Sequence, residues 1–346
     1  MATAFDTVFD SAFARLLLEL CRYTYAAGFA DHRNDDDAQD ALATLRRIGG
    51  PTFDTPLIIR GSPTSVACVA SSPDRNIVAY MGTKTQFDTR ANAMASIRDW
   101  SRNLDTLLVP FALTREQLGA TPADDVDNAN LGGRVHRGFL AELAAVQSLV
   151  VAELSRRGGK SRPLYVTGHS QGGAEAALAT RALVAGGFPV AATYTFAAPR
   201  PGNADFVASV PAALPVHRLE FGDDIVPHVP PALISRESQE IVRNLLALPL
   251  LGDDAREVLN FLAKVNTTNS FHALGKLCYG SNKTRALRVG LSREDEAALF
   301  NDRLWSLVRH PERWAEHHHL AGTTDETNQG LKGNYTALVT MFTIVT

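Results

Sequence analysis

The chain has 346 residues, of which 45% are hydrophobic and 21% are charged, a composition typical of globular proteins. Its formal net charge is −3 and it has no basic run interleaved with aromatic residues, so nucleic acid is not expected as a partner. Three scattered cysteines, Cys21, Cys68 and Cys278, exclude a disulfide framework and a paired metal-ligand motif.

The sequence shows neither a transmembrane pattern nor a signal-peptide pattern. No stretch approaches the roughly 18 uninterrupted apolar residues of a transmembrane helix, so no transmembrane segment is expected. Residues 1–6 lack the basic region and the apolar stretch of a signal peptide. We therefore expect a cytoplasmic protein or a secreted protein whose leader has been removed.

The first 80 residues predict a helix, a connection and two strands. Apolar side chains recur at helical spacing over residues 9–20 and indicate an amphipathic helix. Residues 30–50 are polar, include a run of three aspartates, and are expected to form a surface connection. Residues 65–70 and 76–80 predict two hairpin-like strands, because the residues between them, 71–74, favour a turn.

The middle of the chain alternates between helical and strand patterns. Such alternation indicates βαβ units and a mostly parallel sheet. The predicted helices are 91–108, 135–154 and 173–185, and the predicted strands are 163–167, 190–196 and 216–221. Residues 232–268 interrupt the alternation with two short amphipathic helices, which we interpret either as a cap over one end of the sheet or as peripheral packing helices.

The most informative motif is Gly168-His169-Ser170-Gln171-Gly172. It lies between a predicted buried strand and an alanine-rich helix. A serine on such a sharp turn exposes its hydroxyl, and small residues two positions before and after it allow the neighbouring elements to approach. The pattern and its context are typical of the nucleophile elbow of an α/β-hydrolase.

A serine hydroxyl needs a base and an acid, which in α/β-hydrolases follow the serine along the chain. Asp223 and Asp224 come directly after a predicted strand, where binding and catalytic groups gather in open α/β sheets, although a turn or cap role is the alternative. Five histidines lie between residue 272 and the end of the sequence: His272, His310, His317, His318 and His319. The last three are consecutive, so at most two of them can reach Ser170, and a solvated loop or a weak metal site is the alternative for this run.

The oxyanion formed in acyl transfer needs N–H donors that are already in place. One is the N–H of Gln171, the residue after the serine. The second is expected from the end of an earlier strand, and Thr83 is the best candidate because Gly82 before it allows close backbone approach. The alternative for Gly82 and Thr83 is a simple turn.

These motifs together resemble the class 3 (fungal-type) lipase family, and they follow the family order from about residue 65 to 280. The matching segments are Tyr80-Met81-Gly82-Thr83 (family F-R-G-[ST]), residues 96–104 (S-I-x-x-W…N-L), Val135-His136-Arg137-Gly138-Phe139 (V-H-x-G-F), residues 166–173 (V-T-G-H-S-L-G-G), residues 195–203 (T-F-G-x-P-R-x-G-N), Asp224-Ile225-Val226-Pro227 with Pro230-Pro231 (D-x-V-P-x-x-P-P) and residues 271–276 (Y-x-H-x-G-K).

The resemblance implies one α/β-hydrolase domain over residues 1–346, with a mostly parallel central sheet, flanking helices and a helical lid or cap. It places the lid in residues 84–111 and a helical insertion, a candidate cap, in residues 232–268. It selects Asp224 over Asp223 as the triad acid. For the base, spacing from Leu320 favours His318 and spacing from Glu316 favours His317; we predict His318.

The chain departs from the family pattern at several places. Met81 replaces the usual arginine, and Gln171 replaces the leucine after the serine. The segment between Thr83 and the lid motif is longer than in fungal members, so a larger lid with a different hinge is expected.

The resemblance implies a serine ester hydrolase that cleaves acylglycerols or related carboxylic esters through an acyl-enzyme, as triacylglycerol lipases do. Ser170, Asp224 and His318 would form the triad, and Thr83 and Gln171 the oxyanion hole. No metal and no cofactor is expected, and the partners would be a lipid or ester substrate and, transiently, a lipid–water interface. The alternatives are a phospholipase A1, a short-chain carboxylesterase and, in a different class, a non-catalytic hydrolase-fold scaffold that binds a partner.

Overall fold

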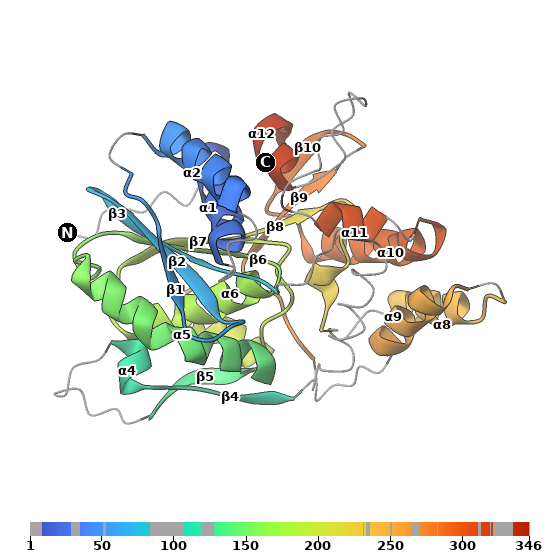
Figure 1. Cartoon of the computed structure of the whole chain (residues 1–346). Helices are drawn as coiled ribbons and strands as arrows, with labels where there is room; N and C mark the ends of the chain where they lie inside the picture. The colour runs from blue at the N-terminus through green and yellow to red at the C-terminus, as the bar shows by residue number, and fades with distance from the viewer. Residues whose placement is uncertain are drawn as a thin grey trace.

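A computed structural model describes residues 9–28, 35–50, 53–83, 107–119, 128–230, 232, 236–249, 251–263, 270–281, 283–310, 313–318, 320 and 335–345. Within these residues, nine strands form one sheet in the order β1-β2-β3-β6-β7-β8-β9-β10-β11 (Figure 1). The strands are β1 (Leu57–Arg60), β2 (Val66–Ser72), β3 (Arg75–Tyr80), β6 (Leu164–His169), β7 (Val190–Phe196), β8 (Val216–Phe221), β9 (Lys276–Ser281), β10 (Ala286–Val289) and β11 (Thr343–Val345).

The centre of the sheet is parallel. Strand β3 pairs with β6, β6 with β7, β7 with β8 and β8 with β9, all in parallel, whereas β1–β2, β2–β3 and β9–β10 are antiparallel. The predicted strands 190–196 and 216–221 are found with the predicted bounds as β7 and β8. The predicted α/β-hydrolase architecture, with a mostly parallel sheet and flanking helices, is confirmed.

Helices cover both faces of this sheet (Figure 1). Side chains alternate along the strands, so Val69 and Val78 pack toward α5 and α6, whereas Cys68 and Ala79 pack toward α1, α2 and α12. These helices are α1 (Ser11–Gly28), α2 (Asp35–Gly49), α5 (Arg137–Arg156), α6 (Gln171–Ala185) and α12 (Tyr335–Met341). Beyond α5 and α6 lies a two-stranded sheet of β4 (Leu108–Thr114) and β5 (Asn128–His136), with α4 (Arg115–Leu118) and α7 (Ala204–Ser209) beside it.

The prediction that residues 30–50 form a surface connection is wrong for the part that the structure describes. Residues 35–49 form α2, which packs against α1 through the buried side chains of Ala41 and Leu45. These two residues are four apart and therefore share one face of a helix. The aspartates that suggested a loop begin the helix, where negative charge is favourable.

Two further helix predictions need correction. The helix predicted to begin at Val135 begins at Arg137, because Val135 and His136 end β5 and the Nδ1 atom of His136 accepts the N–H of Phe139 as a helix cap. Burial lowers the pKa of His136 to about 4, so this imidazole stays neutral and free to accept. Of the helix predicted over 91–108, residues 91–106 lie outside the described residues and Leu108 begins β4.

The structure describes only the last residues of the predicted lid. Residues 84–106 lie outside the described residues, and residues 108–111 of the predicted lid belong to strand β4 instead. Residues of β4 such as Leu108 and Phe111 are buried, and β4 pairs with β5. Within the described residues, β4 therefore replaces the predicted helix only at its last residue, Leu108.

Among the described residues, α5 alone is long and apolar enough to cross a membrane by length and composition. Its side chains Leu143, Val146 and Val150 are fully buried and belong to the core between α5, α6 and the sheet. This packing is that of a core helix.

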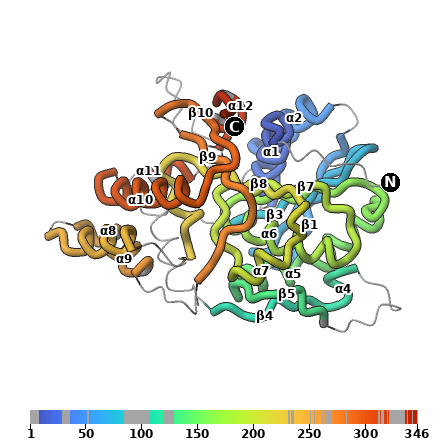
Figure 2. The backbone as a smooth tube through the Cα atoms, turned by 180° about the vertical axis from the view of Figure 1, so that it is seen from behind, coloured from blue at the N-terminus to red at the C-terminus, as the bar shows by residue number. Residues whose placement is uncertain are grey.

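The two helices predicted between residues 232 and 268 are present as α8 (Arg236–Leu246) and α9 (Asp253–Ala263). They pack against α10 (Arg293–Arg309) through Leu245, Leu259 and Leu304, and they lie to one side of the sheet (Figure 2). Ile225 and Val229, which follow β8, belong to the same apolar cluster. The helical pair is thus attached to the turn that leaves β8.

Candidate active site

Ser170 lies on the sharp turn between β6 and α6. Its backbone has φ 57° and ψ −132°, a combination that L residues adopt rarely and at a cost of about 1–3 kcal/mol. Its N–H donates to the carbonyl of Phe196 on β7 (2.9 Å), and its carbonyl accepts the N–H of Gly173 (2.8 Å). These contacts hold the strained turn in place, as expected for a nucleophile elbow.

The glycines of the motif are required by close backbone approach. A Cβ atom on Gly168 would clash with the carbonyl oxygen of Gly172, and a Cβ atom on Gly172 would clash with the carbonyl oxygen of Tyr80 on β3. Backbone atoms within a packed sheet cannot move aside easily. The small residues two before and two after Ser170 therefore have the role that the motif predicted.

A chain of hydrogen bonds links Ser170, His318 and Asp224. The Oγ atom of Ser170 lies 2.9 Å from Nε2 of His318, and Nδ1 of His318 lies 3.0 Å from Oδ2 and 3.1 Å from Oδ1 of Asp224. A carboxylate only accepts hydrogen bonds, so Nδ1 carries the proton and Nε2 is free to accept from the serine hydroxyl. All three side chains are buried. This arrangement can transfer the proton of a serine hydroxyl to an imidazole.

The structure distinguishes the three consecutive histidines. His318, at the end of α11 (Arg313–His318), reaches Ser170. His317 faces the other way: its Nδ1 accepts the backbone N–H of Asp223 (2.7 Å), and its ring packs against Phe221. Burial lowers the pKa of His317, although Asp223 and Asp224 oppose this effect. His319 lies outside the described residues.

The aspartates after β8 are distinguished in the same way. Asp224 is fully buried and faces His318, whereas the carboxylate of Asp223 lies 4.0 Å from Arg313. Oδ1 of Asp224 also accepts the N–H of Val226 (3.0 Å) at the start of the short helix η1 (Val226–His228). The turn after β8 thus directs Asp224, the residue that the family resemblance selects, toward His318, and it directs Asp223 toward Arg313.

Two residues that the sequence reasoning did not single out fix the backbone of His318. The Nε2 atom of His169 lies 2.8 Å from the carbonyl oxygen of His318, which only accepts, so this nitrogen donates. The other ring nitrogen of His169 then accepts from the hydroxyl of Tyr25 on α1 (3.2 Å). The residue before Ser170 thereby anchors the end of α11, which carries His318, and its place inside the elbow motif was the available signal.

A buried ionic cluster supports the end of β8. Glu220 lies between the guanidinium groups of Arg218 and Arg303, and Arg303 also donates to the carbonyl of Gly222 (3.0 Å). Burial alone would raise the pKa of Glu220, but Arg218 and Arg303 outweigh it, and the pKa lies below its ordinary value. This charged group ties the turn before Asp224 to α10.

The two predicted oxyanion residues, Thr83 and Gln171, are adjacent in space. The hydroxyl of Thr83 donates to Oε1 of Gln171 (2.8 Å), and Nε2 of Gln171 donates to the carboxyl of Glu175 (2.9 Å). Gln171 begins α6, whose first N–H groups have no acceptor within the helix. Gly82 is needed beside them because a Cβ atom there would clash with the hydroxyl of Tyr25.

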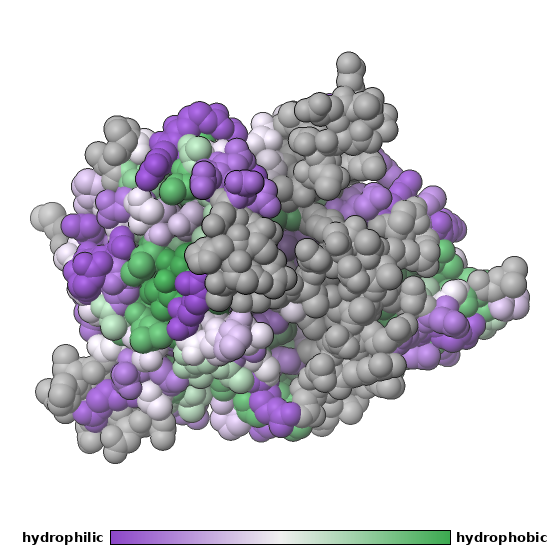
Figure 3. Space-filling view, in the orientation of Figure 1, coloured by the Kyte–Doolittle hydropathy of each residue, from purple (hydrophilic) through white to green (hydrophobic). Residues whose placement is uncertain are grey.

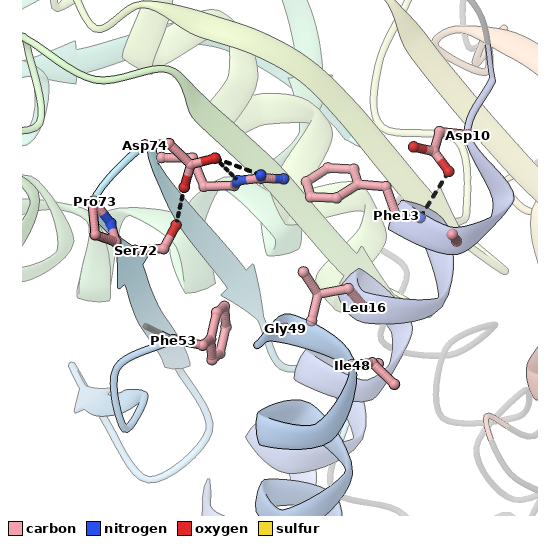
Figure 4. Close-up of a pocket in the computed structure, with 11 residues that line it drawn as sticks. Asp10, Phe13, Leu16, Ile48, Gly49, Phe53, Ser72, Pro73 and Asp74 are labelled. Atoms are coloured by element: carbon pink, nitrogen blue, oxygen red, sulfur yellow. Dashed lines mark hydrogen bonds and ion pairs between the residues drawn. The ribbon is translucent and has the colours of Figure 1, made fainter. Parts of the chain in front are cut away.

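A separate hollow of about 470 Å³ is shown in Figure 4. It is lined by the first turns of α1, the end of α2 and the turn between β2 and β3, including Phe13, Ile48 and Asp74. This turn precedes the start of β3, whereas the end of β3, at Tyr80, pairs with Gly168 beside Ser170. The hollow therefore lies at the opposite end of the sheet from Ser170.

No group of three or more His, Cys, Asp or Glu side chains is placed to hold a metal ion in the described part of the chain. The expectation that no metal or cofactor is needed stays a prediction, since His319 is not among the described residues.

The chain matches a family model over a segment that carries two of the three residues of this triad, Ser170 and Asp224. Residues 78–234 match the family model described as lipase (class 3). A protein named secreted mono- and diacylglycerol lipase 1, from Fusarium solani, is 39% identical over 105 residues, which are 29% of this chain and 31% of that protein. The alignment thus spans about a third of the length of that relative.

Two solved structures are similar to this chain, and the first of them supports the fold. A complex of Rhizomucor miehei lipase with its propeptide is 18% identical, has a TM-score of 0.51 and covers 85% of this chain and 75% of that one. Lipase II from Rhizopus niveus is also 18% identical, with a TM-score of 0.46, and covers 78% and 80%. Residues 78–234, which carry Ser170 and Asp224, are thus similar to the class 3 lipase family, and the Rhizomucor miehei structure shares the overall fold of this chain.

Proposed function

We propose that this protein is a serine ester hydrolase that cleaves acylglycerols or related carboxylic esters through an acyl-enzyme. The observation that carries the proposal is the distance of 2.9 Å between Nε2 of His318 and Oγ of Ser170, with Asp224 on the other ring nitrogen. A scaffold that only binds a partner does not require this alignment of three buried polar side chains.

The proposed reaction has two halves. Oγ of Ser170 attacks the ester carbonyl while Nε2 of His318 takes the hydroxyl proton. The tetrahedral intermediate then collapses, the C–O bond to the alcohol breaks, and His318 returns the proton to the leaving alcohol. In the second half, water attacks the acyl-enzyme with His318 as base, which releases the carboxylic acid and restores Ser170.

Two groups would stabilise the charge that develops. Asp224 keeps the His318 ring in the tautomer that can accept from Ser170, and it stabilises the imidazolium that forms. The backbone N–H groups of Thr83 and Gln171 would hold the oxyanion, where a single donor is worth roughly 10²–10³-fold in rate. The chemistry needs neither a metal nor a cofactor.

We infer an acylglycerol substrate from two supports. The Fusarium solani relative is named for mono- and diacylglycerols. In addition, the connection after α8 exposes Leu248 to 39%, and Figure 3 shows apolar surface beside hydrophilic surface around α8 and α9. A cap formed by residues 232–268, together with a lid in residues 84–106, would contact a lipid–water interface, where exposed apolar groups are no longer in water.

The single-domain organisation over residues 1–346 is part of the same proposal. Secretion is the proposed location, because the Fusarium solani relative is named as secreted, whereas the cytoplasmic alternative has no such support.

The test uses the whole chain and its Ser170→Ala variant. We expect the wild-type protein to hydrolyse emulsified mono-, di- and triacylglycerols, and the variant to lose hydrolysis by several orders of magnitude while keeping its circular dichroism spectrum. A fluorophosphonate probe should label the wild type and not the variant. A wild-type protein that is neither labelled nor active on any ester would be a scaffold, and the proposal would then be wrong.

The same assay separates the alternatives. Faster turnover of phosphatidylcholine than of acylglycerols indicates a phospholipase A1, and activity only on soluble short-chain nitrophenyl esters indicates a carboxylesterase. A chelator should leave the rate unchanged; inhibition by chelation would instead favour a metal role for the histidine run.

A further inference from the structure

A buried carboxyl group lies one helical turn behind the elbow serine. Glu175 is only 1% exposed, and it shares a face of α6 with Gln171 because the two are four residues apart. Unpaired acidic residues are rarely buried to this extent. Neither the family pattern nor the proposed triad uses this side chain.

The hydrogen bonds of Gln171 connect Glu175 to Thr83. With Glu175 as an acceptor, Nε2 of Gln171 donates to it (2.9 Å), and Oε1 of Gln171 accepts the hydroxyl proton of Thr83 (2.8 Å). In this arrangement the Thr83 hydroxyl has no proton left for a substrate. Only its backbone N–H remains for an oxyanion.

The surroundings of Glu175 favour its neutral form. Its second oxygen, Oε2, has no hydrogen-bond partner among the described residues. Among the residues that the structure describes, the titratable groups that interact with it are Tyr25 from α1, Tyr80 from β3 and Glu142 from α5, none of which is a cation. Burial therefore raises the pKa of Glu175 well above its ordinary value, although the hydrogen bond from Gln171 opposes this effect.

A neutral carboxyl group has an O–H that needs an acceptor. Rotation of the Gln171 amide by half a turn brings its oxygen to Glu175 and its NH₂ group to the Thr83 oxygen. The Thr83 hydroxyl then accepts from Gln171, and its own proton is free to point at the oxyanion. An ionised Glu175 only accepts, and it selects the opposite orientation of the amide.

We propose that the Gln171 amide, oriented by Glu175, decides whether the Thr83 hydroxyl can donate to the oxyanion. Gln171 and Glu175 are thus positioning residues of the oxyanion hole. The inference rests on the proposed function, since it concerns the same hydrolysis. It adds a pH-dependent control to that site: the donor is available while Glu175 holds its proton and is withdrawn when the proton leaves.

The test is a kinetic double-mutant cycle on a water-soluble nitrophenyl ester, with kcat and KM measured across pH. Gln171→Leu should lower kcat about tenfold, less than the roughly 10²–10³-fold that loss of a direct oxyanion donor costs, and leave KM nearly unchanged. In a Thr83→Val background, which lacks the hydroxyl, Gln171→Leu should have no further effect on kcat. Equal losses in both backgrounds would overturn the proposal.

The pH profile gives a second, independent readout. In the wild type, kcat should fall on the alkaline side as Glu175 ionises. Glu175→Gln should abolish this fall, because an amide has no proton to lose in this pH range and its NH₂ group can donate to Gln171 at every pH. An alkaline limb that persists unchanged in Glu175→Gln would overturn the assignment.

Gln147→Leu is the matched control. Gln147 is another buried glutamine of the core, and it accepts from Tyr80 rather than from Thr83. Its replacement should lower stability without changing the alkaline limb. Failure of the proposed function is recognised separately, because the wild type would then hydrolyse no ester and the cycle would have no rate to compare.

Discussion

The hydroxyl of Tyr335 donates a hydrogen bond of 2.8 Å to Oδ2 of Asp224, although 111 residues separate the two. Tyr335 is fully buried at the start of α12, and its oxygen accepts the N–H of Phe221 at the end of β8 (3.2 Å). The carboxylate of Asp224 thus receives donors from three segments: Tyr335, Val226 and His318. The C-terminal helix is therefore part of the site.

Tyr335→Phe tests the contribution of this contact. The change removes one hydrogen bond to a buried carboxylate and fills the same space, so the free energy of unfolding should fall by about 1.5–3 kcal/mol. We also expect kcat to fall several-fold with KM nearly unchanged, because His318 is held less firmly. Urea denaturation and steady-state kinetics measure the two effects. A variant with wild-type kcat would show that Asp224 needs only its remaining donors.

The pair His318→Ala and His317→Ala identifies the base. His318 lies 2.9 Å from the serine hydroxyl, so its removal should lower kcat by roughly 10⁴–10⁶-fold. His317 only accepts the N–H of Asp223, so its removal should cost far less. The rate at which a fluorophosphonate labels Ser170 should differ between the two variants in the same order, and this measurement needs no substrate turnover. The opposite order of the two losses would assign the base to His317.

Gly168→Ala tests the packing of the elbow. The added methyl group meets the carbonyl of Gly172, which cannot shift, so the unfolding free energy should fall by about 3 kcal/mol or more. Gly252→Ala is the control, because a Cβ atom there meets none of the described residues within 4 Å, and its effect should stay within about 0.5 kcal/mol. Thermal denaturation compares them. Equal stability of the two variants would contradict the close approach of β6 and α6.

Glu175 should make stability depend on pH. Its pKa in the folded protein is raised by burial, so the folded state holds this proton more tightly than the unfolded chain. The associated stability is fully present below the unfolded carboxyl range and is lost as pH rises toward the folded pKa. Glu175→Gln should remove this decline, which urea titrations between acidic and alkaline pH measure. Parallel curves for variant and wild type would mean that Glu175 is ionised in the fold.

Glu220→Gln tests the ionic cluster beneath the site. The change leaves Arg218 and Arg303 without their shared buried carboxylate, and breaking a buried pair in this way costs about 3–5 kcal/mol. Glu296, which pairs with Arg218 (2.9 Å) but is partly exposed, provides the control Glu296→Gln with a smaller loss. Chemical denaturation of both variants checks the order, and a larger loss for Glu296→Gln would contradict it.

Much of the fold and part of the site could be predicted from local patterns. Strands β7 and β8 were predicted with their bounds because apolar and β-branched residues run continuously through a sheet that is buried on both faces. The elbow around Ser170 could be predicted because its glycines are required by close backbone contacts, which involve residues only a few positions away or on the neighbouring strand. The helix α2 was not predicted because the polar residues at its start are typical of a surface loop. Its few apolar side chains are buried only by packing against α1.

By itself, the sequence determined the elements that local spacing specifies: the central strands, the elbow that holds Ser170 and the position of an acidic pair after β8. Only the tertiary structure decided which ring reaches the serine, because the direction of His317 and His318 depends on how α11 packs against β8 and on the anchor from His169. It likewise joined Glu175 to Thr83 and Tyr335 to Asp224. Contacts between segments so far apart in the sequence depend on the packing of the whole sheet, so they cannot be predicted from local sequence patterns.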